Sequence, residues 1–268
     1  MSPPVLTGLS RIADTYDGII IDLWGTLHNG VVPYPGVVGA LHKLARTHAC
    51  LAVLSNAPRR ATSVAESMAK LGLQVGDGYH VFSSGEEAWV ALAERSDDWY
   101  RSFGRSCYHL GPARDQGMLD NPGLERSEKI EGAEFILCTG VVQPQHEVAD
   151  YDSVLRSAVE RRLPMVCANP DYVVMRGGER EVCAGALAGL YENVLGGNVR
   201  WHGKPQASVY RSCMALMDIV DPARVIMIGD SLNTDISGAA RLGMDSAFIP
   251  GGIHGEELKV GWGEVPDG

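Results

Sequence analysis

Three aspartates and one lysine have the types and positions needed to bind a metal ion and a phosphate group. Asp22 ends one apolar run, Asp230 follows another, and Asp235 lies five residues further on. Lys204 stands in a Gly-Lys-Pro tripeptide after a fourth predicted strand. Open α/β sheets bind ligands at the carboxyl ends of their strands, so we expect these side chains to converge. Such a set could hold Mg²⁺ through oxygen ligands and neutralise a phosphate with an ammonium group.

Each of these residues also has a structural interpretation when taken alone. A strand-end aspartate such as Asp22 or Asp230 is often a helix N-cap or a turn residue. Ser55 and Asn56, which end another apolar run, could simply cap the next helix, and a lysine before proline is usually on the surface. Four such polar positions at predicted strand ends, in this order, are unlikely to be coincidental, so they favour a metal- and phosphate-binding site. Ser55 and Asn56 would add a hydroxyl and an amide to this site.

Alternating strands and helices are predicted to position these residues. The apolar runs are continuous, which is typical of strands buried on both faces of a parallel sheet. Such alternation predicts an α/β fold with helices on both faces of the sheet. Strands are predicted at 16–23, 50–55, 81–82, 198–201, 224–229 and 245–249, and helices at 37–47, 59–71, 85–94, 206–217 and 233–242.

A second set of strands and helices interrupts the first. Strands are predicted at 106–110, 134–140 and 164–168, and helices at 152–162 and 183–195. This set is long enough to form a small α/β domain. We therefore predict a core made of residues 1–95 and 195–268, with an inserted domain at 96–194.

The composition narrows the classes of partner and compartment. The chain has 268 residues, with 23 Lys+Arg against 33 Asp+Glu and a formal net charge of −10. This balance argues against a nucleic-acid partner, which requires clustered basic residues. The first 17 residues lack a secretory signal pattern, and no apolar stretch approaches the length of a membrane span. The six cysteines are scattered, so we expect a cytoplasmic protein with reduced thiols and no membrane partner.

Taken together, the motifs resemble those of the haloacid dehalogenase superfamily of phosphohydrolases. The order is D-x-x-G-T at 22–26, S-N at 55–56, G-K-P at 203–205 and G-D-x-x-x-x-D at 229–235. The large insertion, with Asn-Pro-Asp at 169–171, is similar to that of subclass IIA, which includes the p-nitrophenyl phosphatases and pyridoxal phosphatases. The resemblance covers most of the chain. It implies a Rossmann-like core with a parallel sheet and an inserted α/β cap of the C2 type.

The resemblance also implies a role for each matching residue. Asp22 is expected to attack phosphorus and form an aspartyl-phosphate. Ser55, helped by Asn56, is expected to bind the phosphoryl oxygens, and Lys204 to offset the charge. The implied Mg²⁺ ligands are Asp22, the backbone carbonyl of Trp24 and Asp230, with support from Asp235. The substrate is then a small phosphorylated metabolite, similar to a sugar phosphate or a nucleotide, for which Arg59, Asn169 and Asp171 are candidate contacts under a lid-like cap.

One position departs from the family pattern. Its phosphatases carry a second aspartate two residues after the nucleophile as the general acid/base, and this chain has Trp24 there. An indole N–H cannot transfer a proton at useful pH, and losing an acid/base typically costs ~10²–10⁴-fold in rate. We hypothesise that His28 takes over this task. Alternatively, Trp24 and His28 only pack in the turn, or the leaving group needs no protonation.

Three functions follow from these residues. The first is a Mg²⁺-dependent phosphatase, for which a homodimer is one possible oligomeric state. The second is a regulatory protein that binds phosphate and Mg²⁺ but turns over slowly because of Trp24. The third is a phosphotransferase, or a hydrolase of other bonds, that uses Asp22. Nucleotide P-loop, dinucleotide, serine-hydrolase and zinc-protease motifs do not occur.

Overall fold

The structure, a computed structural model, describes residues 4–6, 8–74, 78–177 and 179–262, which form two compact units. The first unit contains the described residues of Met1–Ser55, Ala65–Phe82 and Lys204–Gly268. The second contains Asn56–Val64 and Ser83–Gly203. Each unit has its own five-stranded sheet, which confirms the predicted α/β class.

The sheet of the first unit has the strand order β12-β11-β1-β2-β3. Its central strand β1 pairs in parallel with β2 on one side and with β11 on the other, and Asp22 lies opposite Leu54 in this register. The carboxyl ends of these three strands therefore meet at one edge. The strands are β1 (Gly18–Asp22), β2 (Cys50–Ser55), β3 (Tyr79–Ser83), β11 (Val225–Gly229) and β12 (Asp245–Phe248).

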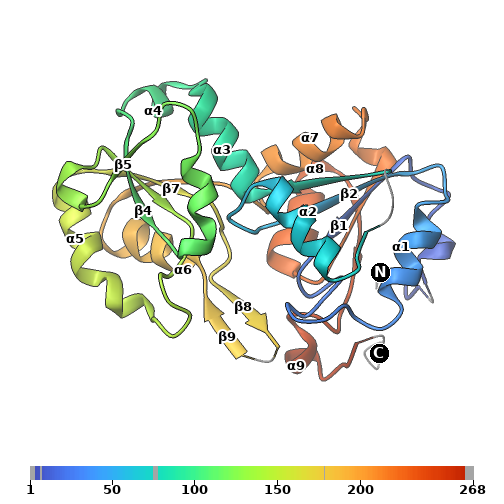
Figure 1. Cartoon of the computed structure of the whole chain (residues 1–268). Coiled ribbons are helices and arrows are strands. Elements are labelled where there is room, and N and C mark those ends of the chain that lie inside the picture. Colours follow the sequence, from blue (N-terminus) through green and yellow to red (C-terminus); the bar gives the residue numbers. More distant parts are fainter. Residues whose placement is uncertain (1–3, 7, 75–77, 178, 263–268) are drawn as a thin grey trace. The chain divides into compact units, whose positions relative to one another are not determined.

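Helices flank this sheet, as Figure 1 shows for α1 and α2 in blue to cyan and for α7 and α8 in orange. Apolar side chains of α7 and α8 pack against the inner strands, where Tyr210 and Ala239 join Ile20, Leu54 and Met227 in one buried cluster. Burial on both faces explains the continuous apolar runs of β1, β2 and β11. The helices are α1 (Val37–Leu44), α2 (Ala61–Lys70), α7 (Ala207–Leu216), α8 (Ser237–Leu242) and α9 (Gly255–Leu258).

Gly243 ends α8, because its φ of 73° lies in the left-handed region, which glycine adopts readily. The start of the predicted 233–242 helix differs, however. Its first turn is a π-helix at Leu232–Ile236, with the N-cap Ser231 accepting a hydrogen bond from the N–H of Thr234. π-Helical turns are frequent at functional sites, and this one contains Asp235.

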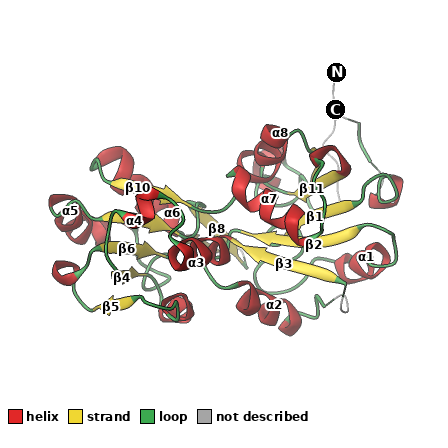
Figure 2. Cartoon of the chain, turned by 90° about the horizontal axis from the view of Figure 1, so that it is seen from above, coloured by secondary structure: helices red, strands yellow, loops and turns green. Residues whose placement is uncertain are grey.

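The second unit has the strand order β10-β7-β6-β4-β5, and every neighbouring pair is parallel. Figure 2 shows β10, β6, β4 and β5 in this succession. A separate antiparallel hairpin joins β8 to β9. The strands are β4 (Ser106–Leu110), β5 (Glu125–Ser127), β6 (Phe135–Cys138), β7 (Pro164–Cys167), β8 (Val173–Arg176), β9 (Glu179–Val182) and β10 (Asn198–Trp201), and the helices are α3 (Ser84–Glu94), α4 (Asp98–Arg101), α5 (Asp152–Glu160) and α6 (Ala184–Gly189).

The chain also contains short helical turns of other types. A π-helical turn at Leu190–Val194 continues α6, so that the predicted helix at 183–195 is divided in two. Turns of 3-10 helix lie at Leu9–Arg11, Ala113–Leu119, Ile130–Gly132, Val148–Tyr151 and Pro222–Arg224.

The boundaries of the units differ from the predicted insertion at 96–194. Helix α3 belongs to the second unit, because its Ala88 and Leu92 are buried in a cluster with Phe135 and Val166. Strand β10 also belongs there, because it pairs with β7. Both elements are predicted to belong to the core because strands and helices alternate along the chain. This alternation does not show which of two sheets a strand joins.

Among the described residues, no helix has the length and apolar character needed to span a membrane.

Candidate active site

Asp22 is the last residue of β1 and is buried at the carboxyl edge of the first sheet. The hydroxyl of Thr26 donates a hydrogen bond to its Oδ2 at 3.3 Å. The turn after β1 passes Gly25, whose φ is +79°, and a Cβ at this position would collide with the carboxylate of Asp230. A glycine is therefore required where the turn brings these two aspartates together.

Asp230 follows β11, the strand beside β1, and is also buried. Its Oδ2 accepts a hydrogen bond from the backbone N–H of Ile253 at 2.6 Å. Burial raises the pKa of Asp230 to about 6, and the nearby charge of Asp235 acts in the same direction. The backbone N–H of Ile253 thus holds the carboxylate of Asp230 in a buried position, where its negative charge is disfavoured.

Lys204 lies between two of the carboxylates. Its Nζ contacts the carboxylate of Asp22 and lies 2.7 Å from Oδ1 of Asp235. Burial opposes the charged form of this lysine, but Asp22 and Asp235 outweigh it and raise its pKa well above the usual value. Oδ2 of Asp235 accepts the N–H of Ser231 at 3.0 Å, so Asp235 connects the π-helical turn to the lysine.

The charges of this cluster favour a divalent cation. Asp22, Asp230 and Asp235 each offer a carboxylate oxygen within 4.8 Å of the others, and all three are buried. Burial raises the pKa of Asp22 well above its usual value, and the other two carboxylates add to this although Lys204 opposes it. Three buried carboxylates against one ammonium leave an excess of two negative charges, and the donors are all oxygens. This set fits a hard dication such as Mg²⁺.

Ser55 and the backbone before Lys204 complete the surroundings. Ser55 is the buried last residue of β2, so it follows the strand paired with β1 at the edge that carries Asp22. Before the lysine, the N–H of Gly203 donates to Oε2 of Glu87 at 3.0 Å. The same Oε2 lies 3.0 Å from Nδ1 of His202. The backbone that leads to Lys204 is therefore held by a carboxylate of α3.

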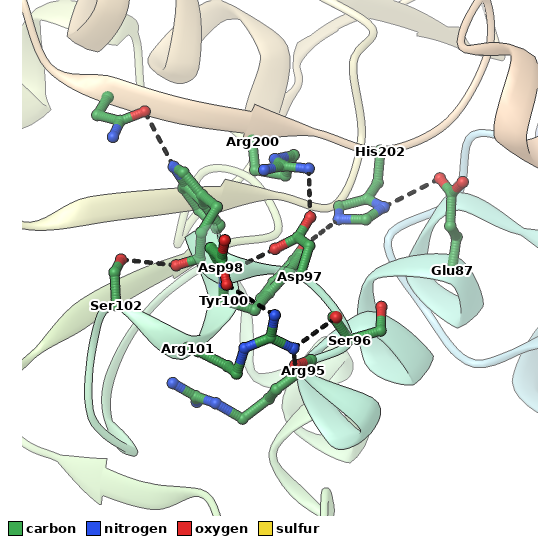
Figure 3. Close-up of polar contacts among 12 residues, drawn as sticks. Glu87, Arg95, Ser96, Asp97, Asp98, Tyr100, Arg101, Ser102, Arg200 and His202 are labelled. Carbon is green, nitrogen blue, oxygen red and sulfur yellow. Dashed lines mark hydrogen bonds and ion pairs between the residues drawn. The ribbon is translucent and has the colours of Figure 1, made fainter.

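His202 is buried within this second polar network, which Figure 3 shows between α3, α4 and β10. Its Nε2 forms a hydrogen bond with the hydroxyl of Tyr100. Arg200, on the same strand, donates to Asp97 at 2.9 Å. The network connects the end of β10 to α3 and α4 of its own unit.

Trp24 and His28 pack together in the turn after β1. Their ring centroids lie 4.9 Å apart in an edge-on arrangement, and a Cβ at Gly30 would collide with the indole. Nδ1 of the buried His28 accepts the N–H of Gly30 at 2.7 Å. This bond occupies the only lone pair of a neutral imidazole, which counts against proton transfer by His28. That role remains a prediction.

The predicted substrate contacts lie in the second unit. Nδ2 of Asn56 donates to Oδ1 of Asp171 at 2.8 Å, and Oδ1 of Asn169 accepts the N–H of Asp171 at 2.9 Å. The structure thus brings these three residues together. Arg59 forms an ion pair with a different residue, and its Nε lies 3.5 Å from Oδ1 of Asp115.

Several residues of this site had no clear signal in the sequence. Thr26 lies inside the D-x-x-G-T motif and could have been singled out there. Ile253 contributes only its backbone, and Glu87 is one of many helix carboxylates, so neither has a recognisable pattern. Tyr34 stacks on Trp262 with ring centroids 3.9 Å apart, a contact between residues too distant in sequence to predict.

Known proteins resemble this chain in sequence and in fold. Residues 16–243 match the family described as haloacid dehalogenase-like hydrolase. Chronophin of Mus musculus is 28% identical over 245 residues, which cover 90% of this chain and 82% of that protein. A crystal structure of a haloacid dehalogenase-like hydrolase from Brucella suis 1330 is 33% identical, covers 92% of this chain and 89% of its own, and superposes with a TM-score of 0.83.

A more distant structure shares the fold. The glycerol phosphate phosphatase of Mycobacterium tuberculosis, solved in complex with magnesium, is 23% identical, with a TM-score of 0.69 and coverage of 90% of this chain and 70% of its own. The family match extends over most of the chain and includes Asp22, Ser55, Lys204 and Asp230. The chain therefore belongs to the haloacid dehalogenase-like hydrolases.

Proposed function

We propose that this protein is a Mg²⁺-dependent phosphatase of a small phosphorylated metabolite, similar to a sugar phosphate or a nucleotide, that acts through an aspartyl-phosphate on Asp22. The observation that carries the proposal is the buried carboxylate of Asp22 at the end of β1, in contact with Lys204 and close to Asp230 and Asp235. The phosphatases among its relatives, including one solved with magnesium, support it.

In the proposed reaction an oxygen of Asp22 attacks phosphorus, and the bond to the leaving-group oxygen breaks with its electron pair. The ammonium of Lys204 offsets the negative charge of the phosphoryl group, and the hydroxyl of Ser55 donates a hydrogen bond to one of its oxygens. Water then attacks phosphorus, which releases inorganic phosphate and restores the carboxylate of Asp22. Asp235 helps to hold the lysine in place through its Oδ1, which lies 2.7 Å from Nζ.

Asp22, Asp230 and the backbone carbonyl of Trp24 would hold the metal ion, with Asp235 supporting them. When bound, Mg²⁺ supplies a Lewis acid that stabilises the charge on the phosphoryl oxygens. The excess of negative charge among the buried aspartates is the reason to expect this cation.

Trp24 determines which substrates suit this site. Because it cannot donate a proton to a departing alkoxide, esters with poor leaving groups are expected to react slowly. Aryl esters and acyl phosphates leave without protonation, so we expect them to be hydrolysed fastest.

The test is phosphate release from a panel of alkyl, aryl, acyl, sugar and nucleotide phosphates, with Mg²⁺ and with a chelator. Asp22→Asn, which keeps the shape of the side chain, is expected to lower kcat by at least ~10⁴-fold. Activity that persists in Asp22→Asn, or that is independent of the metal, would exclude the proposed mechanism. Absence of hydrolysis across the panel would exclude the function.

A further inference from the structure

One segment of the first unit, residues 254–262, contacts three loops at the carboxyl edge of its sheet. The loops follow β1, β11 and β12, which are parallel, with β11 between the other two, so they leave the sheet at the same edge. The loops after β1 and β11 contain proposed metal ligands, namely the backbone carbonyl of Trp24 and the carboxylate of Asp230. The contacts of the segment therefore affect the surroundings of the proposed metal site.

An aromatic stack joins the segment to the loop after β1. The rings of Trp262 and Tyr34 lie with their centroids 3.9 Å apart and their planes 8° from parallel. The N–H of Tyr34 donates to the carbonyl of Leu27 at 3.0 Å, which ties this ring to the turn that follows Asp22. Burial raises the pKa of Tyr34, and the negative charge of Asp230 adds to this effect, so the phenol lies close to that carboxylate.

The backbone of the same segment packs on the loop after β12. A Cβ at Gly251 would lie 2.6 Å from the carbonyl oxygen of Gly261 and 2.7 Å from Cα of Trp262, so the two backbones are in direct contact. Two residues further on, the N–H of Ile253 donates to Oδ2 of Asp230 at 2.6 Å. The loop that holds Asp230 is thus itself held by the backbone at 261–262.

Further contacts fix the segment in place and connect it to the third loop. The side chain of Val260 is buried, and its N–H donates to the carbonyl of Gly255 at 2.9 Å. Nε2 of His254 accepts the N–H of Leu232, in the loop after β11, at 3.4 Å, while Nδ1 lies 3.1 Å from Oε2 of Glu257. The segment is therefore anchored to the loops rather than only lying beside them.

We propose that Trp262 is a positioning residue for the Mg²⁺ site: its ring holds the loop after β1 through Tyr34, and its backbone holds the loop after β12 that donates to Asp230. This role rests on the proposed function, which requires the metal. Ligands that are already held in place lose less freedom when they bind an ion, so the stack should raise the affinity for Mg²⁺. The free energy of one aromatic stack limits the effect on Kd to ~3–10-fold.

Calorimetric titration of Mg²⁺ into the full-length protein measures this role without turnover. Trp262→Leu keeps an apolar side chain but removes the ring, and it should raise Kd ~3–10-fold. Trp262→Phe keeps a ring that can stack and should stay within ~2-fold of wild type. Tyr34→Leu should act like Trp262→Leu, and the two changes combined should add nothing further, because each removes the same stack. Leu258→Ala, at an exposed position of the same segment, is the matched control that keeps the wild-type Kd.

A role in metal positioning also predicts a kinetic result. Hydrolysis by Trp262→Leu should fall at low Mg²⁺ concentration and return to the wild-type rate when Mg²⁺ is saturating, whereas general damage to the fold would not be reversed by the metal. If Trp262→Leu does not fold, Tyr34→Leu tests the same stack.

The proposal is wrong if neither ring deletion changes Kd, if Leu258→Ala raises Kd as much, or if the effects of the two deletions add. If wild type binds Mg²⁺ but hydrolyses no phosphate ester, the phosphatase proposal fails while the comparison of Kd values still decides this one. Absence of Mg²⁺ binding by wild type would overturn both.

Discussion

The ionisation of Asp115 should make the stability of the second unit depend on pH. Burial is the largest cause that raises the pKa of this carboxyl from 3.8 to about 6, against the opposing effect of Arg59. The folded protein therefore binds the proton more tightly than the unfolded chain does. Stability from this group is complete below the unfolded pKa and is lost as the pH rises through the folded value.

The size of the effect follows from the two pKa values. The raised pKa costs about 0.5 kcal/mol at pH 4 and about 3 kcal/mol at pH 8 relative to an unshifted carboxyl. Asparagine has nearly the same shape and no charge at either pH. The difference in the free energy of unfolding between Asp115→Asn and wild type should therefore shift by roughly 2 kcal/mol in favour of the variant when the pH rises from 4 to 8.

The assay is urea unfolding of both proteins across this pH range, followed by tryptophan fluorescence. Three of the five tryptophans, Trp89, Trp99 and Trp201, lie in the second unit and report on it. Burying the asparagine amide costs the same free energy at every pH. This cost therefore does not affect how the difference in unfolding free energy between the two proteins changes with pH. Asp98→Asn, at a fully exposed position, controls for the loss of one charge. A difference between Asp115→Asn and wild type that stays the same from pH 4 to pH 8 would refute the reasoning.

Three further predictions concern the first unit. Mg²⁺ at 100 times its Kd should stabilise wild type by ~2.7 kcal/mol, measured as a rise in Tm, and Asp230→Asn should lose most of this rise because it removes a buried ligand charge. An equal rise in both proteins would remove Asp230 from the metal site. Trp24→Asp should raise kcat for alkyl phosphates by ~10²–10⁴-fold, because it supplies a proton donor; if it creates activity that wild type entirely lacks, the natural protein is a binding protein instead. His28→Ala should preserve the shape of the kcat–pH profile, since Gly30 already occupies Nδ1, and loss of one limb of that profile would assign proton transfer to His28.

The sequence predicted the first sheet well because its strands are buried on both faces. Such strands read as continuous apolar runs, and β2 begins and ends where the pattern placed it. β5 is only three residues long, and β8 and β9 are largely half-buried or exposed, so they carry no apolar run and were not predicted. These strands form because they pair with β4 or with each other, and the local sequence pattern does not identify such pairing.

The convergence of Lys204 with the aspartates was predicted, but one part of the reasoning was wrong. Lys204 does not follow a strand of the sheet that contains Asp22, because β10 belongs to the second sheet. The lysine reaches Asp22 because the chain enters the first unit immediately after Gly203. The cluster of Asp115 and Arg59 could not be foreseen, because it depends on the distance between two side chains that are 56 positions apart.

The path of β10 limits how this protein can be recombined with its relatives. The strand completes the second sheet, its next residue His202 is fixed by α3 and α4, and Lys204 follows two positions later. An exchange of residues 96–194 alone would pair a foreign sheet with the native α3 and β10, and would remove Tyr100, one of the two partners of His202. Only an exchange of the whole segment 83–203 transfers the anchor intact. A chimaera that exchanges residues 96–194 therefore disturbs the backbone before Lys204, and we expect only exchanges of 83–203 to keep the contact of Lys204 with Asp22.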